Sequence, residues 1–180
     1  MIYEVRFVWE VFRFGAIAGS IEETRDVHYG LLGGESLLGD WKPIKFHMRC
    51  PERPSSDLFE VHKGGLIGVM PRTLEEHVEL KSQMEKDGEL LPIHFGDQHA
   101  YLFHCLTTLE AIDRKKSKVD GFRQRDVCSR PVFRGSFTTD HWLFKIPNSV
   151  VCFATQSFAD FYTSNQMTGL ELKPQPMSDC

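Results

Sequence analysis

The segment 101–106, with the sequence YLFHCL, constrains the fold more than any other part of the chain. Its apolar residues occupy both faces of an extended strand, with Tyr101, Phe103 and Cys105 on one face and Leu102 and Leu106 on the other. A strand that is apolar on both faces is typical of a central position, covered on both sides by other elements. We therefore expect a layered fold built around this strand.

Other segments alternate between apolar and polar residues, as half-buried strands do. Alternation is clearest in residues 3–11, where Trp9 and Val11 continue the apolar face, and in residues 44–50. Two prolines in residues 51–54 end the second of these strands. Shorter strands are predicted in residues 90–95, 131–135, 141–147, 150–154 and 170–173.

Residues 71–88 have the pattern of one amphipathic helix. Thr73 and Glu76 form a capping-box pattern beside Pro71, and Gly88 supplies a natural stop. The residues that share the apolar stripe are Leu74, Val78 and Met84, with the stems of His77 and Lys81.

A second helix is predicted in residues 156–166. Phe158, Phe161 and Tyr162 lie at positions i, i+3 and i+4 and therefore form one apolar stripe. Thr155 is expected to cap the start of this helix, and Gly169 permits the backbone to turn out of it into the last strand.

The order of strands, helix, strands, helix and strand predicts an α+β fold, a mixed, mainly antiparallel sheet with two or three helices packed on it. The 180 residues suit one domain, 1–180, and a hydrophobic content of 41% with 14 Phe supplies a substantial core. The glycine-rich residues 15–40 and the charged residues 113–126 are expected to be irregular.

The composition favours a cytoplasmic protein that binds neither nucleic acid nor membrane. The net charge of −4 argues against a nucleic-acid-binding face, and the charged residues among 4–10 interrupt the apolar run that a signal peptide requires. No segment has the roughly 18 consecutive apolar residues of a membrane helix. The five cysteines are widely spaced and odd in number, which indicates free thiols.

Two constellations invite a chemical interpretation. In a hairpin, His94 and His99 can lie opposite each other, but alternation sends His104 to the other face, so these side chains do not converge on a metal. Cys105, like Cys128 and Cys152, lacks any local signature of a catalytic nucleophile. We therefore expect no catalytic residues, no metal and no cofactor. The alternative is a small ligand-binding or enzymatic domain that uses the strand region 94–104.

Charged residues near the middle of the chain have two possible roles. The basic run at 114–118 is expected to be a solvated connection, and it lacks the interleaved aromatic residues that bind single-stranded nucleic acid. Asp113 and Arg134 lie beside apolar strands, where an unpaired charge is costly. They are expected to pair with each other or with nearby backbone, unless both simply reach water.

Several short motifs occur in an order that resembles a known family. They are DW-P-KF at 40–46, the first helix followed by LLPIHF, YLFHCLTTLEAIDRKKSK at 101–118, PVFR at 131–134 and the closing residues 150–174. Together they resemble immunity protein family eleven of bacterial polymorphic-toxin systems, over about residues 40–174. The residues at the family-motif positions are Trp41, Ile112, Asp113, Lys116, Ser117, Phe133, Arg134, Thr155, Phe158 and Gly169.

The resemblance implies a protein that binds and neutralises a cognate toxin domain and catalyses nothing. It implies structural roles for the motif residues and does not identify the toxin-binding residues. If the toxin is basic, an acidic surface would steer the encounter. The candidate acidic residues are Glu75, Glu76, Glu79, Glu85, Asp87 and Glu89.

Overall fold

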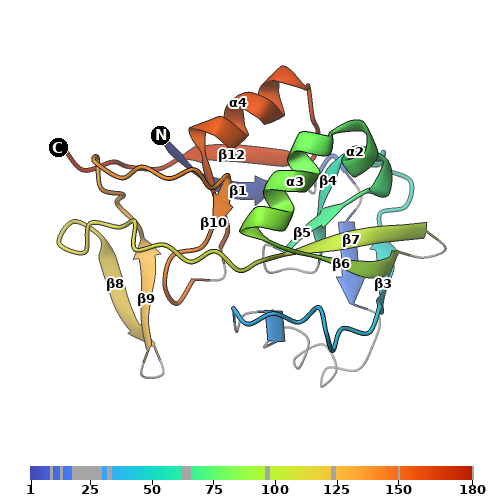
Figure 1. The fold of residues 1–180 in the computed structure, drawn as a ribbon, viewed down its shortest axis with the longest axis horizontal. Coiled ribbons are helices and arrows are strands. Elements are labelled where there is room, and N and C mark those ends of the chain that lie inside the picture. Colours follow the sequence, from blue (N-terminus) through green and yellow to red (C-terminus); the bar gives the residue numbers. More distant parts are fainter. Residues whose placement is uncertain are drawn as a thin grey trace.

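The computed structural model describes residues 1–8, 10–12, 14–17, 30–31, 34–61, 66–95, 98–122, 125–149 and 151–179. The fold is α+β, as predicted, with helices packed on mixed and antiparallel sheets (Figure 1). None of the helices within these ranges is long and apolar enough to cross a membrane.

The larger sheet is curled and closed, with the strand order β2-β3-β6-β7-β5-β4. Strand β7 lies between β5 and β6, and residues 102–105 are buried, which confirms the predicted central strand. The closure of the sheet was not predicted. The strands are β2 (Phe14–Ile17), β3 (Ile44–Arg49), β4 (Leu58–Val61), β5 (Leu66–Val69), β6 (Gly88–Phe95) and β7 (Gln98–Cys105).

A second, antiparallel sheet joins the two ends of the chain in the order β10-β11-β1-β12. Its first strand is shorter than predicted, because the chain turns after Phe7 and leaves Val11 52% exposed. The predicted position of Trp9 lies outside the described residues. The strands are β1 (Ile2–Phe7), β10 (Leu143–Phe144), β11 (Phe153–Thr155) and β12 (Leu170–Pro174).

The predicted first helix is two helices, α2 (Pro71–Glu76) and α3 (Val78–Asp87). The break lies at His77, whose φ of −123° and ψ of 74° are not helical. This break rotates the second half, so that Val78 is 69% exposed and Leu80 is buried instead. Thr73 does not cap the helix, because its hydroxyl donates to the carbonyl of Asp57. The capping-box prediction is therefore wrong at Thr73 and the stripe prediction is wrong at Val78, whereas Leu74 and Met84 are buried as predicted.

The closing helix α4 (Gln156–Ser164) packs on the second sheet as predicted. Phe158 and Tyr162 are buried, whereas Phe161 is half-buried beside Trp142, with ring centroids 4.8 Å apart. Thr155 occupies the N-cap position without capping, because its hydroxyl points to the carbonyl of Trp142. The predicted cap is therefore wrong, and Thr155 is instead held by its backbone and side-chain hydrogen bonds to Trp142.

Gly169 makes the turn from α4 into β12 that the sequence predicts. Its φ is +106°, and a Cβ at this position would lie 1.7 Å from the carbonyl oxygen of Leu58. Both the left-handed backbone and this close approach require glycine. The turn therefore brings the start of β12 close to Leu58 of strand β4 in the curled sheet.

Candidate interaction site at the base of the β8–β9 hairpin

Strands β8 (Lys118–Phe122) and β9 (Arg125–Arg130) form a third sheet by themselves. The hairpin lies at one end of the long axis of the molecule, apart from the other sheets (Figure 1). The expectation of an irregular charged loop at 113–126 is therefore wrong at residues 118–122 and 125–126, which form strands. The pairing is antiparallel, with Val119 opposite Cys128 and Phe122 opposite Arg125.

A hydrogen-bonded clamp closes the base of this hairpin. The backbone N–H of Asp113 donates to the carbonyl of Val132 over 2.7 Å. The hydroxyl of Ser117 accepts from the N–H of Val132 over 2.9 Å and donates to its carbonyl over 3.3 Å. Asp113 also holds the turn before β8, because its Oδ1 accepts from the N–H groups of Lys115 and Lys116 over 3.0 and 3.3 Å. These hydrogen bonds thus join the segment before β8 to the segment after β9.

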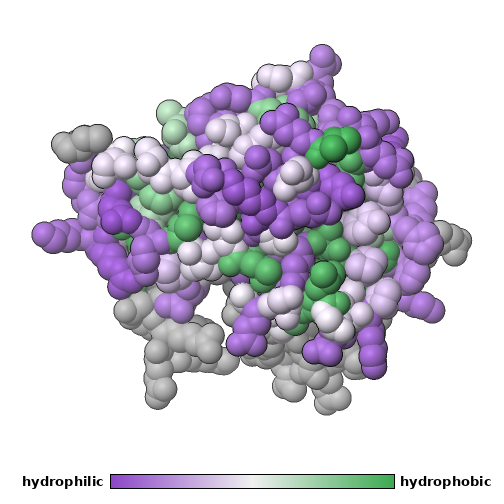
Figure 2. All heavy atoms as spheres, viewed as in Figure 1, coloured by the Kyte–Doolittle hydropathy of each residue, from purple (hydrophilic) through white to green (hydrophobic). Residues whose placement is uncertain are grey.

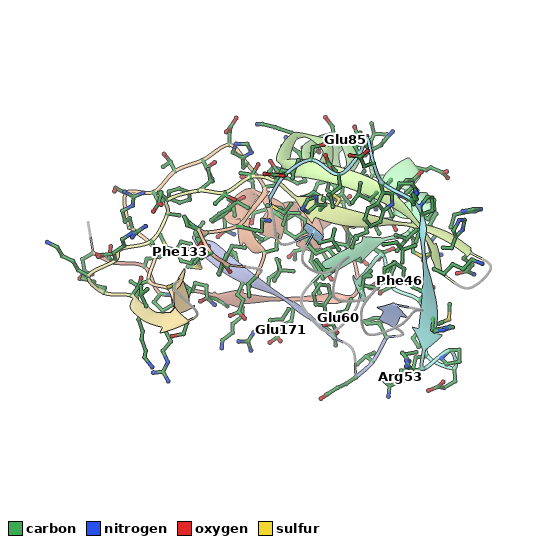
Figure 3. All side chains as sticks on the ribbon, turned by 90° about the horizontal axis from the view of Figure 1, so that it is seen from below. Phe46, Arg53, Glu60, Glu85, Phe133 and Glu171 are labelled. Atoms are coloured by element: carbon green, nitrogen blue, oxygen red, sulfur yellow. The ribbon has the colours of Figure 1, made fainter. Side chains whose placement is uncertain are left out.

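Phe133 fixes the clamp to the body of the protein. Its side chain is fully buried, with ring centroids 5.1 Å from Phe153 and 6.1 Å from Phe144. Its N–H donates to the carbonyl of Pro176, and its carbonyl accepts from the N–H of Ser178. Phe133 lies at the hairpin end of the molecule in Figure 3. The predicted strand 131–135 is reduced to isolated bridges at this residue.

Asp113 and Arg134 take different partners. The carboxylate of Asp113 binds backbone N–H groups, as one of the sequence hypotheses proposed. Arg134 uses its backbone N–H, which donates to the carbonyl of Ala111 over 3.0 Å, while its side chain is exposed. Among the described contacts there is no ion pair between the two residues, so the hypothesis of direct pairing is wrong.

The structure brings together several of the family-motif residues and places the others elsewhere. Asp113, Ser117, Phe133 and Arg134 meet at the hairpin base. Trp41 is half-buried against the curled sheet, where its indole N–H donates to the carbonyl of Pro92 over 2.8 Å. Ile112 and Lys116 also lie at the hairpin base, where Ile112 forms a bridge with Phe133 and the N–H of Lys116 donates to Asp113. The last three, Thr155, Phe158 and Gly169, belong to the helix and turn described above.

Asp87 lies inside the protein, which corrects its assignment to an exposed acidic surface. Its side chain is fully buried at the end of α3 and accepts three hydrogen bonds. Oδ2 accepts from the N–H groups of Trp142 and Leu143 over 2.8 and 2.7 Å, and Oδ1 lies 2.6 Å from Nδ1 of His141. The carboxylate therefore joins α3 to the start of β10. No sequence pattern had indicated this role.

Glu89 is also buried, and the assignment to the acidic surface is wrong here too. It accepts hydrogen bonds from the hydroxyl of Ser36 and the N–H of Leu37, and Nδ1 of His104 lies 3.5 Å from its Oε2. Burial alone would raise the pKa of Glu89, but these hydrogen bonds outweigh it and lower the pKa. This carboxylate ties the segment before β3 to the curled sheet.

His104 is buried on the opposite side of β7 from His99. Burial, followed by the positive charge of Lys145, lowers the pKa of His104 despite the opposing effect of Glu89. His104 is therefore neutral at pH 7. His94 and His99 face each other across the hairpin, as predicted, with ring centroids 5.0 Å apart. The structure thus separates the histidines of region 94–104 into two sites.

The other candidate groups for chemistry are placed as follows. Within the described ranges, no group of three or more His, Cys, Asp or Glu side chains could hold a metal ion. Cys105 and Cys152 are buried, and the interaction with the Cys105 thiol, followed by burial, raises the pKa of the Cys152 thiol. Four of the acidic helix residues remain exposed, namely Glu75, Glu76, Glu79 and Glu85, on a face that is mostly hydrophilic in Figure 2. Comparison of the chain with protein-family models and with curated proteins finds no match.

Proposed function

We propose that this protein is an immunity protein, which binds a cognate toxin domain in the cytoplasm and neutralises it by covering a functional surface. It acts by binding alone, without turnover or a cofactor. The proposal starts from the resemblance of the motifs at 40–174 to an immunity family. The hairpin base is the structural observation that supports it best.

The observation that carries the proposal is the convergence of separate motifs. Asp113 and Ser117 come from one motif, and Phe133 and Arg134 come from another. They meet in a single clamp that holds the β8–β9 hairpin at a fixed position on the body of the protein. A surface that is ordered before binding loses less conformational entropy on association, which favours tight binding. The motif residues thus hold the hairpin in a fixed position, which favours tight binding by an inhibitor that acts through shape alone.

The buried polar residues support the same interpretation. Asp87 and Glu89 accept hydrogen bonds that join separate parts of the chain, and His104 lies against Glu89 in the interior. The hydrogen bonds to the carboxylates of Asp87 and Glu89 thus help to hold the fold together. Such buried networks fix a unique arrangement of the elements that they connect.

The proposal is tested by co-expression with the carboxy-terminal domain of the protein that the gene immediately upstream encodes, which we expect to be the toxin. Cells that produce the toxin domain alone should stop growing, and co-production of this protein should restore growth. A catalytically inactivated toxin domain should elute with it from a sizing column as a one-to-one complex. Absence of both the rescue and the complex would refute the proposal.

A matched variant distinguishes this function from a ligand-binding or enzymatic role for region 94–104. The double substitution His94→Ala and His99→Ala removes the facing pair at partly exposed positions. We expect this variant to rescue growth as well as the parent. Loss of rescue with an unchanged melting temperature would instead assign function to the histidine pair.

A further inference from the structure

The charge of the chain is divided unequally between the hairpin region and the rest. Residues 113–134, here named the basic arm, contain eight Lys or Arg and three Asp, which gives a formal charge of +5. The remaining residues contain 13 Lys or Arg and 22 Asp or Glu, which gives −9. The net charge of −4 is therefore the sum of a cationic segment, residues 113–134, and an anionic remainder of the chain.

Several cations of the basic arm are available to a partner. Lys115, Arg130 and Arg134 have exposed side chains, and none of them forms an ion pair with a residue in the described ranges. Arg114 and Lys116 reach exposed carboxylates at 3.3 and 3.5 Å. Exposed pairs of this kind contribute little free energy and can exchange partners.

The arm is suited to contact through its side chains. Neither outer edge of the β8–β9 ribbon pairs with another strand among the described residues. Lysine and arginine along such an edge disfavour the addition of a further strand. Arginine instead binds carboxylates through two parallel hydrogen bonds, and the clamp at the hairpin base holds the backbone that carries these groups.

We propose that the basic arm is the surface that engages the toxin domain, and that the toxin presents a carboxylate-rich face to it. This inference rests on the function proposed above and adds the chemistry of the partner. An acidic face of a protein can contact the basic arm alone. The extended phosphate backbone of a nucleic acid would also lie near the rest of the protein, whose formal charge of −9 would repel it. The partner is therefore an acidic protein surface, and the acidic residues of α2 and α3 are not the contact.

Charge reversal at the three free cations tests this assignment. The arm variant is Lys115→Glu, Arg130→Glu and Arg134→Glu. Its control is Lys42→Glu, Lys45→Glu and Arg49→Glu, which changes the same charge at exposed positions on and beside β3. Binding of each protein to the catalytically inactivated upstream toxin domain is measured by surface plasmon resonance at about 50 and 200 mM salt.

We expect the arm variant to bind about 100-fold more weakly than the parent, mainly through slower association, and the control to bind within about threefold. The parent's affinity should fall as salt rises, and this dependence should be smaller in the arm variant. The circular dichroism spectrum should be the same for all three proteins. The neutral variant, with glutamine at the three arm positions, should bind with intermediate affinity.

The remaining outcomes overturn the assignment in distinguishable ways. If the parent binds the toxin and the arm variant binds equally well, the arm is not the contact, although the immunity function stands. If the parent itself does not bind, the proposed function fails and the arm assignment fails with it. If duplex DNA binds the parent in an arm-dependent manner while toxin binding is unchanged, the arm is a nucleic-acid contact.

Discussion

Replacement of Asp87 gives the most direct test of how this fold is held together. Its buried carboxylate accepts from two backbone N–H groups and lies within hydrogen-bond distance of His141. Both N–H groups, those of Trp142 and Leu143, reach the same oxygen, Oδ2. Alanine removes every acceptor, whereas asparagine can present one carbonyl oxygen to both N–H groups. The two substitutions should therefore differ in cost.

The magnitude follows from these contacts. Each buried N–H group left without a partner costs about 1–3 kcal/mol, so two cost about 2–6 kcal/mol. Removal of a negative charge from the C-terminal end of α3 returns about 0.3–1 kcal/mol, because that end of a helix dipole is negative. Asp87→Ala should thus lower the free energy of unfolding by about 1–6 kcal/mol. Asp87→Asn keeps neutral hydrogen bonds, which are about half as strong as charged ones, and should cost about 1–3 kcal/mol.

Urea denaturation followed by circular dichroism measures both values, with an unchanged slope as evidence that the unfolding transition is the same. Glu85→Ala is the matched control, because it removes a carboxylate from the same helix at an exposed position, 3.8 Å from Lys81. It should change stability by less than about 0.5 kcal/mol. A cost below about 1 kcal/mol for Asp87→Ala would refute the reasoning. Equal costs for alanine and asparagine would show that the shared oxygen is not what matters.

Three further predictions concern single residues. Gly169→Ala should lower the free energy of unfolding, measured in urea, by about 3 kcal/mol or more, because Gly169 has a positive φ and a close backbone contact. Gly39→Ala is the control and should be nearly neutral, because the space around Gly39 is open. Equal losses for the two variants would contradict this. His104 has a lowered pKa in the folded protein, so the stability that it contributes is present above its unfolded pKa of about 6.5 and is lost as the pH falls towards the folded pKa. The melting temperature of the parent should therefore decline below about pH 6.5, and His104→Gln should make this decline less steep. An unchanged slope of melting temperature against pH would contradict this. Phe158→Ala should cost about 3–5 kcal/mol and the half-buried Phe161→Ala about 1–2 kcal/mol, and urea midpoints that rank them in reverse would contradict the observed packing.

Residue periodicity predicted those parts of the fold that depend on one segment at a time. The central strand β7 and the helix α4 could be read from the sequence because burial of their own side chains determines them. Gly169 could be identified because only glycine suits its turn. The break at His77 could not, since the helical pattern of residues 71–88 continues across it, and α3 packs against β10, which is distant in sequence, as well as against β6. The closure of the curled sheet depends on pairings between such distant strands and has no local signature.

The β8–β9 hairpin shows why a charged segment was mistaken for a loop. Its alternating apolar residues, including Val119 and Cys128, are diluted by Lys and Arg, and the hairpin is clamped by Ser117 and Val132, which lie outside the paired strands. The family-motif residues Asp113 and Phe133 pointed to this region, but the sequence did not show that they meet. The segments that carry these two residues are joined by backbone hydrogen bonds, which side-chain patterns do not encode.

Burial reduces the acidic surface that was predicted from the sequence. Asp87 and Glu89, counted in the acidic face from sequence, lie in the interior and contribute nothing to it. Among the remaining acidic residues of that face, Glu85 lies 3.8 Å from Lys81, so part of its charge is already compensated. Lys115, Arg130 and Arg134 of the basic arm are exposed and form no ion pair with a described residue, and the base of the ribbon is fixed by Ser117. Because charged groups without a nearby counter-charge steer association, we propose that the arm is the surface on which charge controls the rate of association with the toxin domain.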